Sequence, residues 1–463
     1  MELKGEFLSM LSEALGEDKL PTVVRALDET ASVSLRLNPF KSEGVHLPIL
    51  EGSTPVEWSP YGRMLRERPV FTLHPLFHSG VYYVQDSSAM YVGSAFRDML
   101  PRFSRLGRPL RVLDLCAAPG GKTTDLAASL RGELGDGFIL VSNEVMRNRA
   151  TVLADNVGRW GDPCVVVTCA DPSAFAKLDS FFDIIVADVP CSGEGMFRKD
   201  AEALAQWSPE NVKLCAERQR RIVADVWPSL APGGVMIYST CTFNNCENDG
   251  NVDWICASLG AEKLSSKTLV PGFVPGEGQY CAVMLKNLCG GHAGEERWTD
   301  RKGGRQQEGR QQGGRQHGGR RAGGLITGLD AEGLFDVPMD LKLRSDMITA
   351  VPQCISGLAD TVSSALPLLS RGCAVGTLKG KDLVPDEDLA LCIRLRRGAF
   401  EETPVDKAAA LAFLHKDALV LPDSPRGIVM LTYKGVPLGF VKNLGNRTNS
   451  LHPQARRIRM DIK

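Results

Sequence analysis

The segment from about residue 109 to residue 240 most constrains how this chain folds, because short apolar runs alternate there with helical runs. The apolar runs are RVLDLCAA, FILVSNE, VVVTCAD, FDIIVADVP and GGVMIYSTC, and sequences such as KTTDLAASL separate them. Strands that alternate with helices are typical of βαβ units and a parallel sheet. Such strands are buried on both faces, which explains continuous runs such as IIVA. The sequence therefore predicts an α/β fold here.

The 463 residues divide into regions with different patterns. Residues 1–100 are expected to form a helical lead region, in which SVSLRLNPF (32–40) and the start of VYYVQDSSAMYVG (81–93) are strand-like. Residues 101–289 hold the α/β pattern. After a linker at 290–324, residues 325–463 fold again as an α+β region, with GIVMLTY and LGFVKNL as strands and KAAALAFLHKD as a helix.

The linker at 290–324 is a degenerate repeat of Gly, Arg and Gln with almost no apolar residues. Such a segment cannot offset the entropic cost of ordering itself, so we predict that it is disordered. Flexible chains of this length span roughly 30 Å. Its arginines are typical of segments that bind RNA without sequence preference, and a flexible tether that happens to be basic explains them equally well.

Composition excludes several classes of protein. No run of about 18 apolar residues occurs, and the N-terminus lacks the apolar core of a signal peptide, so we expect a cytoplasmic chain without a membrane span. The 13 cysteines are an odd number without paired zinc spacing, so we expect reduced thiols and no metal. The net charge of -1 does not by itself indicate a nucleic-acid-binding protein.

A strand, a turn of small residues and a helix start follow one another in VLDLCAAPGGK (112–122). Gly120 and Gly121 allow close approach of a ligand, and the next helix offers free N–H groups. The segment matches neither GxGxxG nor a Walker loop, which argues against a dinucleotide or ATP. Together these features favour a nucleotide-like cofactor at the carboxyl end of the strand.

Acids end the three strands that follow, namely Glu144, Asp171 and Asp188. An acid after the second strand can bind both ribose hydroxyls, and Asp171 is placed to meet an adenine edge. Any one of them can instead simply cap the next helix. As a set behind a glycine-rich turn, they favour ligand binding.

Two cysteines follow the ends of the fourth and fifth strands, Cys191 in ADVPCSGEG and Cys241 in YSTCTF. Adjacent parallel strands would bring both to one edge of the sheet, near the cofactor. The alternative is that both are buried core thiols, which is the usual fate of a cysteine. Their turn-like neighbours, such as Pro190 and Gly193, favour an exposed, reactive pair.

The three motifs LCAAPGGK (115–122), DVPCSGEG (188–195) and YSTCTF (238–243) resemble, in order and spacing, the signature motifs of the Sun (Fmu) family of RNA cytosine-C5 methyltransferases. The resemblance covers at least residues 30–290. It implies a class I S-adenosylmethionine-dependent methyltransferase fold, which is Rossmann-like. One mild departure is Glu247-Asn248-Asp249, where the family usually has a second Glu.

The resemblance also implies roles for individual residues. The cofactor would contact Glu144 through its ribose, Asp171 through its adenine and Asp188 through its amine. Its methionine and ribose part would be lined by Cys116, Ala117, Ala118, Pro119, Gly120, Gly121 and Lys122. Carbon 5 of cytosine is a poor nucleophile, so the thiol of Cys241 would first add to carbon 6. Asp188 would be the acid that stabilises the intermediate at N3. Cys191 would act as the second basic group and assist release of the product.

The segment GVPLGFVKNLGNRTNSLHPQARR (435–457) resembles the PUA-like end of the RsmF-type (YebU-type) branch, which modifies small-subunit ribosomal RNA. We therefore expect 16S rRNA or a ribosomal subunit as the partner of a monomer, with a splayed-out target cytosine. Arg198 and Lys199 are expected to touch phosphates, as are the regions flanking the core. Transfer RNA remains an alternative substrate, and a non-catalytic ribosome-assembly protein remains an alternative function.

Overall fold

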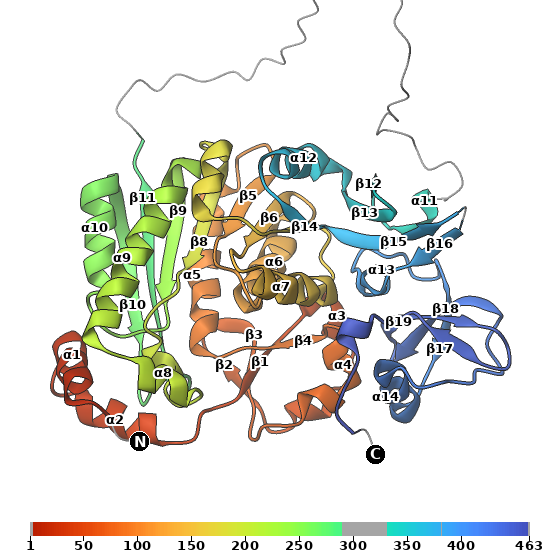
Figure 1. The fold of residues 1–463 in the computed structure, drawn as a ribbon, viewed down its shortest axis with the longest axis horizontal. Coiled ribbons are helices and arrows are strands. Elements are labelled where there is room, and N and C mark those ends of the chain that lie inside the picture. The colour runs from red at the N-terminus through yellow and green to blue at the C-terminus, as the bar shows by residue number, and fades with distance from the viewer. Residues whose placement is uncertain (1–2, 289–330, 381, 462–463) are drawn as a thin grey trace, which may run out of the picture.

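The structure is a computed structural model that describes residues 3–288, 331–380 and 382–461 (Figure 1). The linker predicted at 290–324 lies outside the described residues. Within the described ranges, no helix is long and apolar enough to cross a membrane.

An eight-stranded sheet forms the centre, in the order β10-β11-β9-β8-β5-β6-β7-β14. Its strands are β5 (Leu110–Asp114), β6 (Phe138–Asn143), β7 (Val165–Thr168), β8 (Phe182–Asp188), β9 (Leu230–Thr240), β10 (Ala261–Leu269), β11 (Gln279–Lys286) and β14 (Leu368–Arg371). The strands from β7 to β9 run parallel, as the alternating pattern predicts. The predicted Rossmann-like core is therefore confirmed.

The sheet is mixed rather than wholly parallel, because both of its edges carry antiparallel strands. On one side β11 pairs with β9 and β10 pairs with β11. On the other side β14, which comes from the chain beyond the linker, pairs with β7. The reason on the first side is local: β10 and β11 are consecutive strands joined without a helix, so they pair as an antiparallel ribbon.

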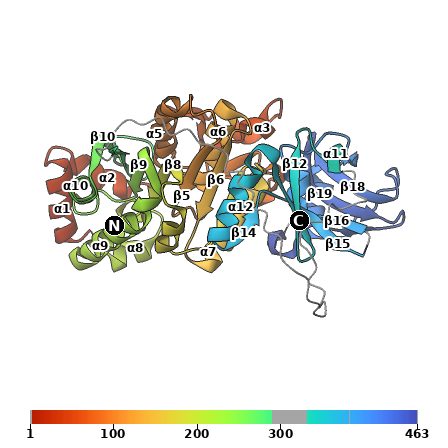
Figure 2. The same ribbon diagram turned by 90° about the horizontal axis from the view of Figure 1, so that it is seen from above.

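Helices cover both faces of this sheet. In Figure 2, α5 and α6 lie on one side of the sheet and α9 on the other. The helices around the sheet are α5 (Tyr91–Met99), α6 (Gly121–Leu134), α7 (Arg147–Trp160), α9 (Pro209–Val226), α10 (Asp249–Leu259) and α12 (Ser356–Ala365). All six residues of β6 are buried, as expected of a strand that is covered on both faces.

The lead region combines helices with a second sheet. Helices α1 (Gly5–Leu15), α2 (Leu20–Asp28), α3 (Pro39–Ser42) and α4 (Pro75–His78) accompany a four-stranded sheet, β2-β3-β1-β4. Its strands are β1 (Ser34–Leu37), β2 (Thr54–Val56), β3 (Ser59–Met64) and β4 (Tyr82–Val84). The strand-like stretches at 32–40 and 81–93 become β1 and β4. The prediction of a helical region missed β2 and β3, which carry Pro55 and Pro60 and lack an alternating apolar pattern.

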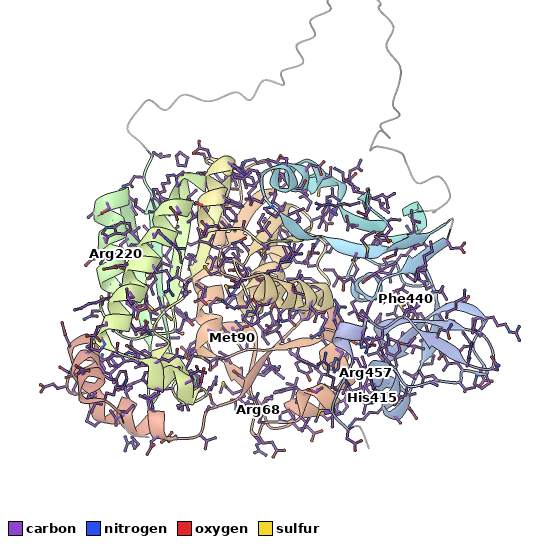
Figure 3. All side chains as sticks on the ribbon, in the orientation of Figure 1. Arg68, Met90, Arg220, His415, Phe440 and Arg457 are labelled. Atoms are coloured by element: carbon purple, nitrogen blue, oxygen red, sulfur yellow. The ribbon has the colours of Figure 1, made fainter. Side chains whose placement is uncertain are left out.

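The region after the linker is α+β, as predicted, and it forms two four-stranded sheets. The first contains β12 (Met339–Arg344), β13 (Met347–Pro352), β15 (Cys373–Lys379) and β16 (Asp382–Pro385). The second contains β17 (Glu401–Pro404), β18 (Gly427–Tyr433), β19 (Val436–Asn443) and β20 (Thr448–Ser450). Helices α11 (Ala331–Leu334), α13 (Glu387–Leu391) and α14 (Lys407–His415) join them. The predicted strands and helix correspond to β18, β19 and α14. Phe440 and His415, labelled in Figure 3, mark β19 and the end of α14.

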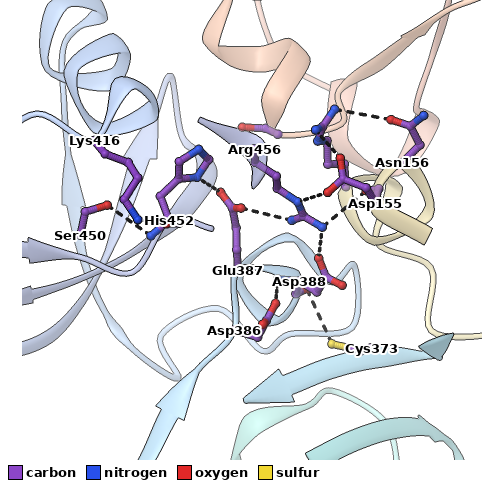
Figure 4. Close-up of polar contacts among 12 residues, drawn as sticks. Asp155, Asn156, Cys373, Asp386, Glu387, Asp388, Lys416, Ser450, His452 and Arg456 are labelled. Atoms are coloured by element: carbon purple, nitrogen blue, oxygen red, sulfur yellow. Dashed lines mark hydrogen bonds and ion pairs between the residues drawn. The ribbon is translucent and has the colours of Figure 1, made fainter. Parts of the chain in front are cut away.

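A buried charge cluster attaches the C-terminal segment to the core (Figure 4). Arg456 pairs with Asp155 of α7 at 2.5 Å, with Asp388 at 2.7 Å and with Glu387 at 3.2 Å. Glu387 also accepts a bond from His452 at 2.8 Å. Together with β14, this cluster holds the C-terminal region against the methyltransferase-like core.

Candidate active site

The turn between β5 and α6 is held from two neighbouring elements. Ala117 donates its N–H to the carbonyl oxygen of Asn143 on β6, at 2.8 Å. From α7, Arg149 donates to the carbonyl oxygen of Ala118 at 3.0 Å, and Asn156 donates to that of Pro119 at 2.8 Å. These bonds fix the turn, so the first N–H groups of α6 face one direction at the carboxyl edge of the sheet.

Gly120 begins α6 in a left-handed conformation, with φ of 113°. A Cβ atom there would also lie 3.2 Å from Cδ1 of Leu153 on α7. The backbone angle favours glycine at this position, and the contact with Leu153 leaves little room for a side chain. The structure thus relates Gly120 to packing against α7, and close approach of a ligand at this position stays a prediction.

Glu144, at the carboxyl end of β6, is buried, and its carboxylate is fixed by two bonds. It accepts the N–H of Met146 at 3.0 Å and pairs with Arg149 at 3.1 Å. Beside it, the apolar side chains of Val145 and Met146 are about half exposed, at 53% and 54%. An ordered carboxylate next to uncovered apolar side chains suits a ribose and the flat face of a base.

Asp171 is exposed and caps the short helix that follows β7. Its side chain accepts the N–H of Ser173 at 3.0 Å and the hydroxyl of Ser173 at 2.7 Å. These bonds lower the pKa of Asp171. The capping role considered for such an acid is therefore present, and contact with adenine stays a prediction.

Asp188 lies at the end of β8 and faces Lys122, the last residue of the glycine-rich motif, at 2.8 Å. It also accepts bonds from Ser239 Oγ at 2.7 Å and from Gln279 Nε2 at 3.1 Å. Burial alone would lower the pKa of Lys122, but the Asp188 carboxylate raises it above its ordinary value. The cofactor turn and the ends of β8, β9 and β11 therefore meet at one carboxylate.

The two predicted cysteines lie together. The Sγ atoms of Cys191 and Cys241 are 3.1 Å apart, and both side chains are partly exposed rather than buried in the core. Hydrogen bonding with Cys241 and burial raise the pKa of Cys191 well above its ordinary value. The alternative of two inert core thiols does not fit this contact at the carboxyl edge of the sheet.

Two buried glutamates join the loop that contains Cys191 to the loop that contains Cys241. Glu194, from the Cys191 loop, accepts the N–H of Phe243 at 2.7 Å and of Asn244 at 3.2 Å, just after Cys241. Glu247, from the Cys241 loop, accepts the N–H of Ser192 at 3.0 Å. Each loop thus holds the other through a carboxylate that accepts backbone N–H bonds.

Some residues of this site were missed by the sequence analysis. Asp114 ends β5, is fully buried and accepts a bond from Thr123 at 2.7 Å. Its position at a strand end was a usable signal, since the same signal selected Glu144 and Asp188. Gln279, by contrast, reaches Asp188 from an antiparallel strand whose place beside β9 the sequence did not indicate.

The expected phosphate contact of Arg198 is wrong. Its side chain is 6% exposed and pairs with Glu277 at 2.6 Å, and it donates to the carbonyl oxygen of Gly276 at 2.7 Å. Lys199 is partly exposed, but it pairs with Asp86 at 3.1 Å and with Glu277 at 3.4 Å. This basic pair therefore helps to hold the loop between β10 and β11 in place.

The residues present fit S-adenosylmethionine. Glu144 and the apolar side chains beside it suit the nucleoside. Asp188 offers a carboxylate for an amine, and the start of α6 offers the first N–H groups of a helix. Among the described residues, no cluster of His, Cys, Asp and Glu has the arrangement of a metal site.

Three family models match this chain in succession. The model described as the N-terminal domain of 16S rRNA methyltransferase RsmF matches residues 3–87. The model of 16S rRNA methyltransferase RsmB/F matches residues 108–279. The model of the methyltransferase RsmF PUA domain matches residues 400–458.

Curated relatives with the name ribosomal RNA small subunit methyltransferase F align with the chain. The protein of Serratia proteamaculans is 43% identical over 183 residues, which are 39% of this chain and 36% of the relative. The protein of Klebsiella pneumoniae is 29% identical over 434 residues, which are 87% of this chain and 84% of the relative. The stronger match thus spans about a third of its relative's length.

Among solved structures, a methyltransferase homologue from Pyrococcus horikoshii superposes with a TM-score of 0.50 at 23% identity. The alignment covers 61% of this chain and 95% of that one. This likeness supports the methyltransferase fold of the core.

Proposed function

This chain belongs to the RsmB/F family of S-adenosylmethionine-dependent methyltransferases and to its RsmF branch, and on that premise we propose that it methylates carbon 5 of a cytosine in 16S rRNA. The observation that carries the reaction is the contact of Cys191 with Cys241 beside Asp188. Two sulfurs at one sheet edge, next to a carboxylate and a cofactor turn, match the needs of addition to a pyrimidine ring.

The reaction begins at Cys241. Its thiolate adds to carbon 6, and the electron pair of the ring's 5,6 double bond moves to carbon 5. A proton taken up from solvent and held between the Asp188 carboxylate and N3 neutralises the ring as this happens. S-adenosylmethionine, when bound, supplies an electrophilic methyl group, which carbon 5 takes up.

Release restores the aromatic ring. Cys191 Sγ, as a thiolate, removes the proton from carbon 5, the double bond forms again, and Cys241 leaves as a thiolate. The proton held at N3 returns to solvent. Cys191 is suited to this step by its place 3.1 Å from the leaving sulfur. The enzyme ends the cycle with its two sulfurs unchanged, and one proton has passed from the cytosine to solvent.

Lys122 and Gln279 position Asp188 rather than react themselves. Lys122 supplies a positive charge 2.8 Å from the carboxylate, and Gln279 donates from the opposite side at 3.1 Å. With both bonds made, the Asp188 carboxylate keeps one orientation toward the ring. Contacts of Glu144 and Asp171 with the cofactor form part of this proposal.

The regions that flank the core suit an RNA substrate. The model of the N-terminal domain matches residues 3–87, before the core, and the model of the PUA domain matches residues 400–458, after it, and we propose that both regions contact RNA. An enzyme for 16S rRNA works in the cytoplasm, which is the compartment proposed here. A monomer stays a prediction.

Methyl transfer to defined RNAs tests this function. The purified protein is incubated with labelled S-adenosylmethionine and, separately, with unmodified small subunits, free 16S rRNA and transfer RNA, and the nucleosides are then identified. We expect 5-methylcytosine in the subunit or the 16S rRNA. Label in transfer RNA alone would contradict the substrate, and no label in any RNA would favour the non-catalytic assembly role.

A further inference from the structure

Glu247 holds the backbone on both sides of Cys191. Its Oε2 accepts the N–H of Ser192 at 3.0 Å and the side-chain N–H of Gln219 at 2.6 Å. The same Gln219 nitrogen donates to the carbonyl oxygen of Pro190 at 3.0 Å. The residues before and after Cys191 are therefore both tied, directly or through one amide, to a single carboxylate.

Glu247 is fully buried, and within the described part of the chain it forms no ion pair. Its donors are neutral: Ser192, Gln219 and Asn244, the last at 2.9 Å. Hydrogen bonds from neutral donors favour the ionised carboxylate but leave its charge uncompensated. Burial raises the pKa of Glu247, and the neighbouring Glu194 adds to this effect.

The charges around the two sulfurs differ. Cys191 faces the carboxylates of Glu247 and Asp188, and both raise its pKa after the effects of Cys241 and burial. A negative charge on Cys241, in contrast, contributes to the raised pKa of Lys122. A negative group disfavours a nearby thiolate and a positive group favours it.

Other titratable groups also lie near the pair. Glu194 accepts the N–H groups of Phe243 and Asn244, which follow Cys241, at 2.7 and 3.2 Å. Tyr238 of β9 donates its hydroxyl to the carbonyl oxygen of Glu247 at 2.7 Å and is a neutral phenol. Arg220 of α9, labelled in Figure 3, donates to Asn251 at 2.7 Å and stacks on Trp254. It is linked to Glu247 through Asn251 and Gln219 rather than by an ion pair among the described residues.

We propose that Glu247 is a positioning residue that holds the proton shared by the cysteine pair on Cys191, and so leaves Cys241 as the sulfur that ionises. This inference rests on the proposed function for its catalytic meaning, but the ionisation itself is a property of the free protein. Two thiols in contact titrate as a pair, and fixed charges decide which one keeps the proton.

The protons of the cysteine pair balance over one reaction cycle. In the resting pair Cys191 is a thiol and donates to the Cys241 thiolate. Once Cys241 is bonded to carbon 6, its negative charge is lost, and Cys191 can release its proton to solvent. Cys191 then takes the proton from carbon 5 as Cys241 leaves, which restores the resting pair.

Thiol alkylation tests this assignment without methylation activity. The protein is treated with iodoacetamide over a range of pH values, and peptide mass spectrometry follows Cys191 and Cys241 separately. In the wild type we expect Cys241 to react with a midpoint at lower pH than Cys191. In Glu247→Gln, which keeps an acceptor for Ser192 but loses the charge, the Cys191 midpoint should move down by about one unit, a tenfold gain in its thiolate fraction.

Glu247→Asp is the matched control, because it retains the charge and tests whether the effect is merely structural. Its two midpoints should stay close to those of the wild type. The proposal is overturned if Cys191 reacts before Cys241 in the wild type, a result that needs no variant to fold. It is also overturned if Glu247→Gln leaves the midpoints unchanged, or if Glu247→Asp shifts them equally. Failure of the proposed function would appear instead as absence of 5-methylcytosine with these midpoints intact.

Discussion

The Sγ atoms of Cys191 and Cys241 lie 3.1 Å apart although 50 residues separate them in the chain. The contact arises because β8 and β9 are neighbouring parallel strands, with Asp188 opposite Ser239 in the register. Cys191 follows the end of β8 by three residues and Cys241 follows the end of β9 by one, so the two loops open at the same edge. The reaction proposed here depends on this relationship.

Asp188→Asn should nearly abolish methylation while the protein remains folded. An amide cannot share a proton with N3 as a carboxylate does, and loss of such proton transfer typically costs about 10²–10⁴-fold in rate. The measurement is kcat with saturating RNA, beside a thermal unfolding curve. A variant with more than about a tenth of wild-type kcat would exclude Asp188 from the chemistry.

Gly195→Ala should disturb catalysis through the position of Cys241. A Cβ atom at this position would lie 2.8 Å from the carbonyl oxygens of Cys241 and Glu277, both of them backbone. The Gly195 N–H also donates to the carbonyl oxygen of Cys241 at 2.8 Å, so an added side chain forces the loop to shift. We expect kcat to fall about tenfold or more, because displacement of a reacting group by about 1 Å costs up to about 10²-fold.

Gly132→Ala is the control for that substitution. Gly132 lies within α6, and nothing lies within 4 Å of an added Cβ atom. Alanine favours a helix interior over glycine by about 1 kcal/mol, so the variant should be as active as the wild type and slightly more stable. Equal activity loss in both variants would show that the Gly195 effect is not local.

Asp114→Asn should change how stability depends on pH. Burial raises the pKa of Asp114 to about 7 from its ordinary value of 3.8. Between these values the folded chain keeps a proton that the unfolded chain has lost. Stability therefore falls as pH rises from about 4 to 7, by up to about 4 kcal/mol from this group. Urea unfolding at pH 5 and pH 8 should show a smaller difference for Asp114→Asn than for the wild type, and an equal difference would refute the assignment.

Arg456→Ala should loosen the C-terminal region from the core. The guanidinium is buried among Asp155, Glu387 and Asp388 (Figure 4), and its removal leaves these carboxylates without their shared cation. Removing one partner of a buried ionic cluster costs about 3–5 kcal/mol. Denaturant unfolding measures the loss, with the exposed Arg447→Ala as the control that should stay within about 0.5 kcal/mol.

Much of the catalytic core could be predicted because its signals are local. Apolar runs that alternate with helices determine the parallel strands, and residues just after the strand ends must then meet at one edge. Cys191, Cys241 and Asp188 were selected in this way, whereas Lys122 was named through the family resemblance. Asp114 also ends a strand, so the same reasoning could have selected it, although the sequence analysis did not name it.

Other features could not be predicted because they depend on contacts between distant segments. The strand β14 has only four residues, and its place beside β7 is set by packing of the C-terminal region. Glu194 and Glu247 are buried carboxylates with neutral donors, whereas a glutamate in a sequence indicates an exposed side chain. Arg198 was misjudged for the same reason, since its buried partner Glu277 lies 79 residues away.

The most direct test of the central claim compares Cys241→Ala with Cys191→Ala in the presence of S-adenosylmethionine and small-subunit RNA. Denaturing electrophoresis detects covalent protein–RNA adducts, and nucleoside mapping detects 5-methylcytosine. We predict that Cys241→Ala forms neither adduct nor product, whereas Cys191→Ala accumulates an adduct that it cannot resolve. Methylation by Cys241→Ala at the wild-type rate, or an adduct that persists without Cys241, would contradict the assignment of Cys241 as the nucleophile.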